Sequence, residues 1–181
     1  MPTKYHLSTV NEKSHYNFHE NDPADMRYRQ FLGRLFNPVT KRIATGSHGL
    51  DFGSGPGPTL SVMFEEEGHS VRIYDPFYAD DLNVFNERYD FITASEVAEH
   101  LRQPNREFKR LWRCLRPGGI LGVMTQFLTG DTPFATWYYI TDPTHICFYS
   151  AKTFQWLAEF WQAELEFPSE NVAIFSKAQD D

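Results

Sequence analysis

The nonapeptide GLDFGSGPG, residues 49–57, constrains the fold more than any other part of this sequence. It begins as a short apolar run that contains one acid, Asp51, and it ends in glycines at three alternate positions. Glycine adopts positive φ and lets a ligand approach the main chain, so glycines clustered directly after a short strand indicate a ligand-binding turn. A helical pattern from about residue 58 to residue 67 follows. Strand, tight turn and helix in this order form the first half of a βαβ unit.

The spacing of the glycines separates two kinds of nucleotide-binding turn. The dinucleotide fingerprint is GxGxxG, and Pro58 stands where its third glycine is needed, so the pattern here is GxGxG. This spacing disfavours an NAD-dependent oxidoreductase. Asp75 ends the next apolar segment, residues 70–74, where an acid can accept hydrogen bonds from both hydroxyls of a ribose. The alternative is purely structural: an ordinary strand-to-helix turn, and an Asp-Pro turn at Asp75.

The remaining hydrophobic patterns predict an α/β order that ends in an antiparallel hairpin. Strands are expected at residues 89–93, 120–125, 163–167 and 171–176, and helices at residues 102–115 and 151–161. Before the first strand, Asp22 is expected to cap a helix with Pro23 at its first position, and Asn37-Pro38 is expected to end it. Residues 1–22 lack sustained periodicity and are expected to form an irregular arm.

Composition limits the kinds of partner. The chain has 181 residues, which suits one core, with an arm and helix over residues 1–45 and a ligand-binding domain over residues 46–181. Its net charge is −7 and no run of lysine or arginine occurs, so we expect a small-molecule partner and no long nucleic acid. The isolated cysteines, Cys114 and Cys147, exclude a disulfide framework and fit the cytoplasm. No segment predicts a membrane span or the apolar core of a signal peptide.

The segment SEVAEH carries a second candidate site. Glu96, Glu99 and His100 stand at i, i+3 and i+4, which on a helix puts all three side chains on one face. Two acids and an imidazole can bind a cation. The alternative interpretation is a helix start, in which Ser95 caps the helix and the acids are stabilised by its dipole.

Together these features resemble the class I S-adenosylmethionine-dependent methyltransferases, especially the small ones related to the ubiquinone-pathway O-methyltransferases. The resemblance covers about residues 46–177 and rests on LDFGSGPG, Asp75, YDFITASEVAEHL, LWRCLRPGGIL and the terminal hairpin. It implies a Rossmann-like α/β sandwich and S-adenosylmethionine as the methyl donor. The implied donor contacts are Asp51, Gly53, Ser54, Gly55 and Asp75, with Phe77 on the adenine face and Ser95 and Glu96 at the methionine tail.

One feature departs from the family pattern. The family places a helix, a third strand and another helix between its second and fourth strands, and the 13 residues from Pro76 to Arg88 cannot hold them. We therefore expect a reduced sheet in which the third strand is short or missing, and Asp80 and Asp81 are only loose candidates for adenine contacts. The second strand would be an exposed edge that must be covered or paired, and a homodimer is one way to do so.

A further resemblance concerns His145. The segment DPTHICFYSAKTFQWLA resembles the piece that brings a fourth ligand to an ExxEH face in small-RNA 2′-O-methyltransferases and in some ubiquinone-pathway enzymes. It implies a site of Glu96, Glu99, His100 and His145 for magnesium, manganese, iron or zinc. A divalent ion would position an acceptor hydroxyl and lower its pKa. Without a metal, His100 or His145 would be the general base, so the catalytic candidates are His100, His145 and Glu99. A structural role for His145 is the alternative.

Two segments have open roles. The aromatic residues Trp137, Tyr138, Tyr139, Phe148 and Tyr149 form either a wall around the acceptor or part of the core. In many methyltransferases of this fold the N-terminal segment lies over the cofactor as a lid. The resemblance implies the same role here for the segment that contains Tyr16, His19, Asn21 and Tyr28. The leading hypothesis is a methyltransferase that acts on a hydroxyl of a small molecule. The alternatives are a non-catalytic Rossmann-like binding module and an RNA 3′-end 2′-O-methyltransferase.

Overall fold

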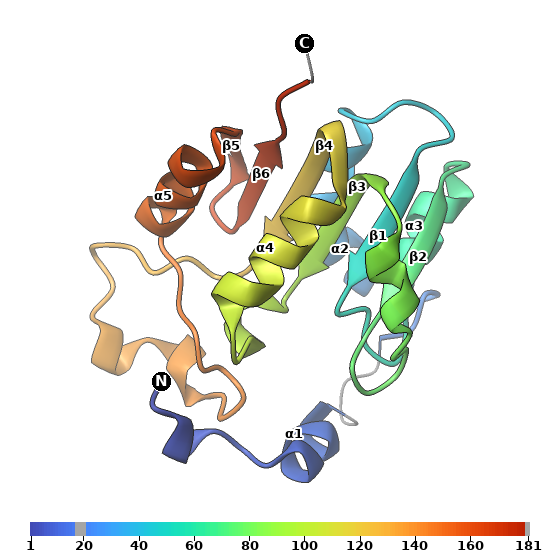
Figure 1. The fold of residues 1–181 in the computed structure, drawn as a ribbon. Coiled ribbons are helices and arrows are strands. Elements are labelled where there is room, and N and C mark those ends of the chain that lie inside the picture. The colour runs from blue at the N-terminus through green and yellow to red at the C-terminus, as the bar shows by residue number, and fades with distance from the viewer. Residues whose placement is uncertain (17–20, 180–181) are drawn as a thin grey trace.

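A six-stranded sheet forms the centre of the protein, as seen in a computed structural model that describes residues 1–16 and 21–179 (Figure 1). The strands are β1 His48–Phe52, β2 Ser70–Tyr74, β3 Tyr89–Ser95, β4 Leu115–Met124, β5 Glu164–Ser169 and β6 Val172–Ser176, in the spatial order β2-β1-β3-β4-β6-β5. Strands β1 to β4 are parallel, and β6 is antiparallel to both of its neighbours. The Rossmann-like order and the terminal hairpin predicted from the sequence are confirmed.

Helices cover both faces of the sheet. They are α1 Thr9–Tyr16, α2 Met26–Thr40, α3 Thr59–Glu66, α4 Pro104–Cys114 and α5 Ala151–Trp161, joined by 3-10 turns at Thr3–Tyr5, Leu82–Asn86, Ala98–His100, Phe134–Thr136 and Tyr138–Thr141. Helices α2 and α3 pack on one face, and α4 and α5 pack on the other (Figure 1). None of the helices in the described ranges has the length and apolarity needed to cross a membrane.

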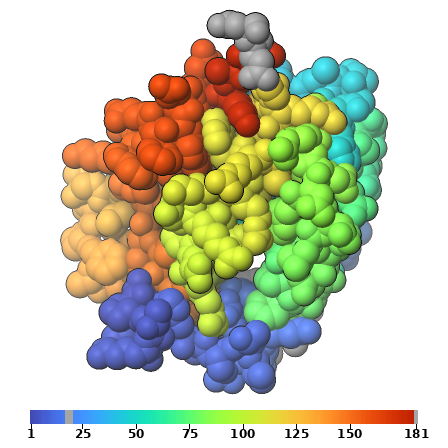
Figure 2. Space-filling view, viewed as in Figure 1, coloured from blue at the N-terminus to red at the C-terminus, as the bar shows by residue number. Residues whose placement is uncertain are grey.

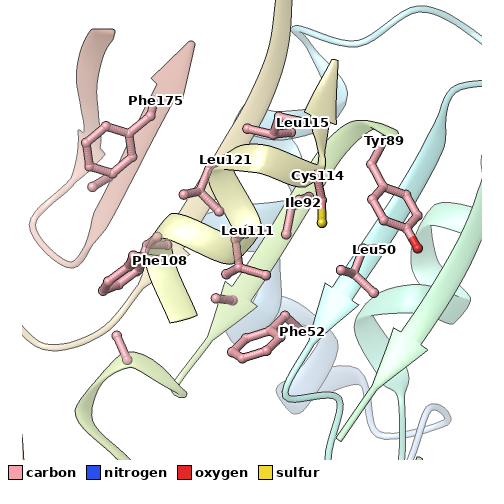
Figure 3. Close-up of a cluster of buried hydrophobic side chains, with 14 of the residues drawn as sticks. Leu50, Phe52, Tyr89, Ile92, Phe108, Leu111, Cys114, Leu115, Leu121 and Phe175 are labelled. Carbon is pink, nitrogen blue, oxygen red and sulfur yellow. The ribbon is translucent and has the colours of Figure 1, made fainter. Parts of the chain in front are cut away.

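The hydrophobic core on the α4 side of the sheet fixes the position of the loop between β3 and α4. Phe108 and Leu111 of α4 lie one turn apart and pack in the same buried cluster as Ile92 and Leu121 of the sheet (Figure 3). Complete burial of a side chain of this size contributes about 1.5–3 kcal/mol. Because this packing holds α4 against β3 and β4, the loop between β3 and α4 is held at the carboxyl edge of the sheet.

The third strand of the family pattern is missing. After β2 the chain makes a tight turn with a bridge between Asp75 and Ala79, then the 3-10 turn Leu82–Asn86, and then enters β3. Within the described residues nothing pairs with the free side of β2, so the predicted reduced sheet is confirmed. Arg72 lies in the middle of this edge strand and pairs with Asp81 at 2.9 Å and Glu87 at 3.3 Å. Charges on an edge strand oppose non-specific pairing.

The N-terminal region differs from the sequence-based expectation in three ways. Residues 9–16 form α1 rather than an irregular arm. The next helix, α2, begins at Met26 with Asp25 as its cap, whereas Asp22 accepts a hydrogen bond from the backbone of Ala24 in the preceding turn. Pro38 does not end α2, because it lies in the last turn, where its missing N–H removes a single hydrogen bond.

Candidate active site

A cavity of about 970 Å³ lies at the carboxyl ends of β1, β2 and β3. All eleven site residues predicted from the sequence line it, namely Asp51, Gly53, Ser54, Gly55, Asp75, Phe77, Ser95, Glu96, Glu99, His100 and His145. Figure 2 shows a hollow where the N-terminal segment (blue), the segment after β2 (green) and the start of α4 (yellow-green) approach one another. Asp80 and Asp81 are not among the residues that line the cavity. Five separate segments of the chain therefore converge on one space.

The glycine turn is shaped by close contacts. Gly53 has a φ of 79°, and a Cβ atom placed on it would lie 2.3 Å from a methyl group of Val97. Gly55 has a φ of 65°, and its N–H donates to the carboxylate of Asp75 at 3.0 Å. A side chain at Gly53 would displace Val97, so the turn after β1 keeps its shape only with glycine there.

Asp75 is held by backbone amides. One carboxylate oxygen accepts from Gly55, and the other accepts from the N–H groups of Phe77 at 2.8 Å and Tyr78 at 3.2 Å. The side chain is buried and borders the cavity. Asp75 therefore begins an Asp-Pro turn and also faces the glycine turn. From the sequence alone, these two arrangements were alternatives.

Asp51 is a buried carboxyl group behind the glycine turn. The pKa of Asp51 is raised to about 7: burial is the largest cause, a hydrogen bond from the Thr93 hydroxyl at 2.9 Å opposes the rise, and the nearby charge of Asp75 adds to it. Burial dominates because an apolar environment disfavours the charged form. A cation that entered the cavity beside Asp51 would be attracted to the ionised form.

A second polar cluster lies deeper, around Glu99. This side chain is completely buried, and one of its oxygens accepts from the hydroxyl of Tyr139. Its other oxygen, Oε2, has no partner among the described residues. The Tyr139 hydroxyl also lies 3.2 Å from the hydroxyl of Thr125 and 3.4 Å from a carboxylate oxygen of Glu96. A buried oxygen without a partner is unfavourable, and it marks a place for a ligand.

Two histidines complete this cluster. Nδ1 of His145 lies 2.7 Å from the carbonyl oxygen of Tyr139, and Nδ1 of His100 lies 3.1 Å from that of Thr144. Because a carbonyl oxygen only accepts, we assign a proton to each Nδ1, which leaves each Nε2 as the basic nitrogen. Ligand atoms of Glu99, His100 and His145 all lie within 4.8 Å of one another. Burial and the neighbouring His100 lower the pKa of His145, which favours the neutral ring.

The two carboxyl groups of the cluster repel one another. Burial raises the pKa of both Glu96 and Glu99, and the charge of Glu99 raises that of Glu96 as well. Glu96 is not a member of the group formed by Glu99, His100 and His145, and Tyr139 lies between the two acids. A cation bound near both carboxylates would remove this repulsion.

The local backbone at SEVAEH differs from the predicted helix. Ser95 is the last residue of β3, Glu96 has a φ of 52°, and Ala98–His100 form a 3-10 turn that no side chain caps. The N–H of Glu96 donates to the carbonyl oxygen of Met124 at 2.8 Å, so the pairing between β3 and β4 continues one residue beyond β3. Glu96 adopts positive φ at this point. The prediction of one helical face was therefore wrong, although Glu99 and His100 still reach the same cavity.

Tyr139 was missed as a site residue. The sequence marked it only as one aromatic residue in a possible wall, whereas it contacts Glu96, Glu99 and His145. Of the five aromatic residues in that wall, Tyr138 and Tyr139 line the cavity, and Tyr149 belongs to the core. A tyrosine six residues before a candidate ligand was the available signal, but sequence spacing could not show that its hydroxyl turns inward.

The N-terminal segment covers one side of the cavity. Glu12, Tyr16, Asn21 and Tyr28 line it. The ring of Tyr16 packs edge-on against His100 at 5.4 Å between centroids. His19, also assigned to the lid, lies outside the described residues.

A family profile described as "Methyltransferase domain" matches residues 21–166. The chain therefore belongs to the methyltransferase domain family. Its fold is that of the class I S-adenosylmethionine-dependent methyltransferases, as the sequence resemblance indicated.

The curated relatives are similar over part of the chain. A protein named ubiquinone biosynthesis O-methyltransferase from Pseudomonas savastanoi pv. phaseolicola is 32% identical over 88 residues, and one of the same name from Pseudomonas syringae pv. syringae matches equally. This match covers 48% of the present chain and only 37% of each relative.

Solved structures share the fold at low sequence identity. An O-methyltransferase family protein from Burkholderia thailandensis has a TM-score of 0.62 at 12% identity, covering 94% of this chain and 64% of that one. A methyltransferase from Methanosarcina mazei described as S-adenosylmethionine-dependent has a TM-score of 0.59 at 13% identity. The match covers 79% of this chain and 98% of that one. A phosphoethanolamine N-methyltransferase from Haemonchus contortus, solved with S-adenosylhomocysteine, has a TM-score of 0.57 at 17% identity. The match covers 91% of this chain and 44% of that one. At these identities the similarity concerns the fold.

Proposed function

We propose that this protein binds S-adenosylmethionine in the cavity of about 970 Å³ and transfers its methyl group to a hydroxyl of a small molecule. The observation that carries the proposal is the convergence of the glycine turn, Asp75 and the Glu99 cluster on that one cavity. Family membership supports the class of reaction. The acceptor is proposed from the chemistry of the cluster.

The donor end of the cavity suits an adenosyl sulfonium. The close-packed turn at Gly53 and Gly55 offers backbone rather than side chains, and the fixed carboxylate of Asp75 would accept hydrogen bonds from a ribose. Asp51 adds an acid whose ionised form would attract the positive charge of the donor. When bound, S-adenosylmethionine supplies an electrophilic methyl carbon and leaves as a thioether.

The acceptor end offers a base. When no metal occupies the cluster, the neutral ring of His145, with its proton on Nδ1, can take the hydroxyl proton at Nε2 as the acceptor oxygen attacks. The carbonyl of Tyr139 holds the ring in this tautomer and stabilises the imidazolium that results. His100 offers the same chemistry beside it, with ring centroids 4.8 Å apart.

We also propose that Glu99, His100 and His145 hold a divalent metal. The chemistry of this set fits, because it combines a buried carboxylate oxygen without a partner and two imidazole nitrogens within 4.8 Å. A bound ion would supply a Lewis acid that lowers the pKa of the acceptor hydroxyl. The test is elemental analysis of protein purified without a His tag. Glu99→Ala and His145→Ala should lose bound metal, and equal metal content in both variants and the wild type would contradict the proposal.

The donor proposal is tested by isothermal titration calorimetry with S-adenosylmethionine. The wild type should bind, and Asp75→Ala should weaken binding at least about tenfold, since it removes hydrogen bonds to a carboxylate. Asp80→Ala removes an acid five residues away, outside the cavity lining, and should leave affinity unchanged. Absence of binding to the wild type would instead favour the non-catalytic binding module.

A further inference from the structure

A second hollow, of about 650 Å³, lies between α4 and the segment that contains Phe85 and Arg88. We call it the α4 groove. Its lining includes Phe85 and five basic side chains, those of Arg88, Arg106, Lys109, Arg110 and Arg113. No carboxylate is among the described residues that line it. This concentration of positive charge is unexpected in a chain with a net charge of −7.

Three of the five groove cations, Arg88, Lys109 and Arg113, lack the acidic partners that several other arginines of the described chain have. Ion pairs join Arg29 to Glu66, Arg42 to Glu166 and Arg116 to Asp90. In the described part of the chain, no ion pair involves Arg88, Lys109 or Arg113, and all three are exposed.

The spacing of these residues adds repulsion. Arg106 and Arg110, and likewise Lys109 and Arg113, stand at i and i+4 of α4, where like charges destabilise a helix. Glu107, at 3.1 Å from Arg110 and 3.9 Å from Arg106, offsets part of the first pair. An anion bound in the groove would remove the repulsion that remains.

The groove continues into the candidate active site. Arg106 and Arg110 line both the groove and the larger cavity. Arg110 is fixed between Glu107 and the ring of Phe85, whose centroid lies 4.3 Å from its guanidinium carbon. From Arg106 to Arg113 the helix rises roughly 10 Å. One molecule can therefore place its reacting group in the cavity and an anionic part along α4.

We propose that the α4 groove binds phosphate groups carried by the methyl acceptor, an inference that rests on the proposed function. Arginine presents a planar fork of donors that matches phosphate oxygens, and several spaced cations suit a group with more than one negative charge better than a single carboxylate. The acceptor class is then a phosphorylated small molecule with a free hydroxyl.

The test is calorimetric titration of the full chain with sodium tripolyphosphate at low ionic strength. The wild type should bind, and affinity should fall as salt is added. The triple variant Arg88→Gln, Lys109→Gln, Arg113→Gln changes only groove residues outside the cavity lining and should bind at least about tenfold more weakly. The matched control Arg27→Gln, Lys41→Gln, Lys152→Gln removes the same charge from exposed positions elsewhere and should bind as the wild type does.

The possible outcomes are distinct. Equal affinity in both triple variants, or no binding to the wild type, would overturn the proposal. Binding to vesicles of phosphatidylglycerol without binding to tripolyphosphate would also overturn it, and would assign the groove to a lipid surface. The groove variant should keep its affinity for S-adenosylmethionine, which also verifies its folding. Failure of the wild type to bind S-adenosylmethionine would contradict the proposed function and leave the phosphate result readable on its own.

Discussion

Two glycines on either side of β1 make separable contributions to stability, because Gly53, in the glycine turn, meets two constraints and Gly46, before β1, meets only one. Both have positive φ, but only at Gly53 would a Cβ atom collide, with Val97. We therefore expect Gly46→Ala to lower the free energy of unfolding by about 1–3 kcal/mol for the backbone conformation alone, and Gly53→Ala to lower it by more. Urea denaturation of both variants measures the difference.

A second substitution identifies the cause. Val97→Ala removes the methyl groups that a Cβ at Gly53 would meet, so it should recover part of the loss in the double variant Gly53→Ala, Val97→Ala. Strict additivity of the two single effects would contradict the steric explanation.

Asp51 gives the stability of the protein a characteristic pH dependence. Its pKa is about 7 in the folded chain, above the value of about 4 expected in an unfolded one, so the folded state binds more protons between these values. The free energy of unfolding should therefore fall as the pH rises from about 4 to 7. Asp51→Asn keeps an acceptor for Thr93 without the titration, and should flatten this fall.

Chemical denaturation at several pH values checks this expectation. Glu96 and Glu99 have raised pKa values too, so some fall should persist in Asp51→Asn. Identical slopes for the variant and the wild type would mean that Asp51 is not the buried acid described here.

At the scale of elements, α1 depends on the rest of the protein. It has no buried residue, and Arg102 donates to the backbone of Leu7 and to the carboxylate of Glu12, each at 2.7 Å. Arg102→Gln should loosen α1 and, where α1 acts as the lid, speed release of S-adenosylhomocysteine by up to about fivefold, since exposed ion pairs contribute about 0.2–1 kcal/mol. Stopped-flow fluorescence measures this rate. Arg27→Gln serves as the control, and an unchanged rate for Arg102→Gln would argue against a lid.

The elements that sequence reasoning found and missed differ in how they are stabilised. The bounds of β2 and α5 were predicted to the residue, because their apolar periodicity and flanking signals agree. Helix α1 has no apolar stripe, and contacts far along the chain support it, so periodicity could not reveal it. The 3-10 turn at Ala98–His100 was predicted as a helix because the two share the i, i+3 spacing, and only the sheet register imposes positive φ on Glu96.

Site residues show the same division. The candidate residues next to strand ends line the cavity as expected, since a parallel sheet brings the carboxyl ends of its strands to one edge. Tyr139 lies in the long connection between β4 and α5, whose path depends on tertiary contacts. Sequence spacing therefore could not predict that its side chain lies beside Glu99.

At the scale of the whole molecule, the free side of β2 leaves the backbone groups of an edge strand unpaired within the described residues. We propose that two copies meet along this edge as a homodimer, since edge strands expose unpaired backbone groups. Sedimentation velocity across a range of protein concentrations should show a species of twice the monomer mass. A monomer at every concentration would contradict the proposal and leave Arg72, Asp81 and Glu87 as the protection of this edge.

The shortened sheet also matters for chemical tools. Where a longer sheet would continue beyond β2, the described chain has the turn near Ala79 and the 3-10 turn Leu82–Asn86, while Tyr16 of α1 packs on Phe77 with ring centroids 5.8 Å apart. If the purine ring of the donor lies against Phe77, as the family resemblance implies, a fluorophore or biotin linker that leaves the ring on the side away from α1 would meet no further strand of the described chain. We expect this protein to bind donor analogues built in this way, and fluorescence polarisation would measure their affinity.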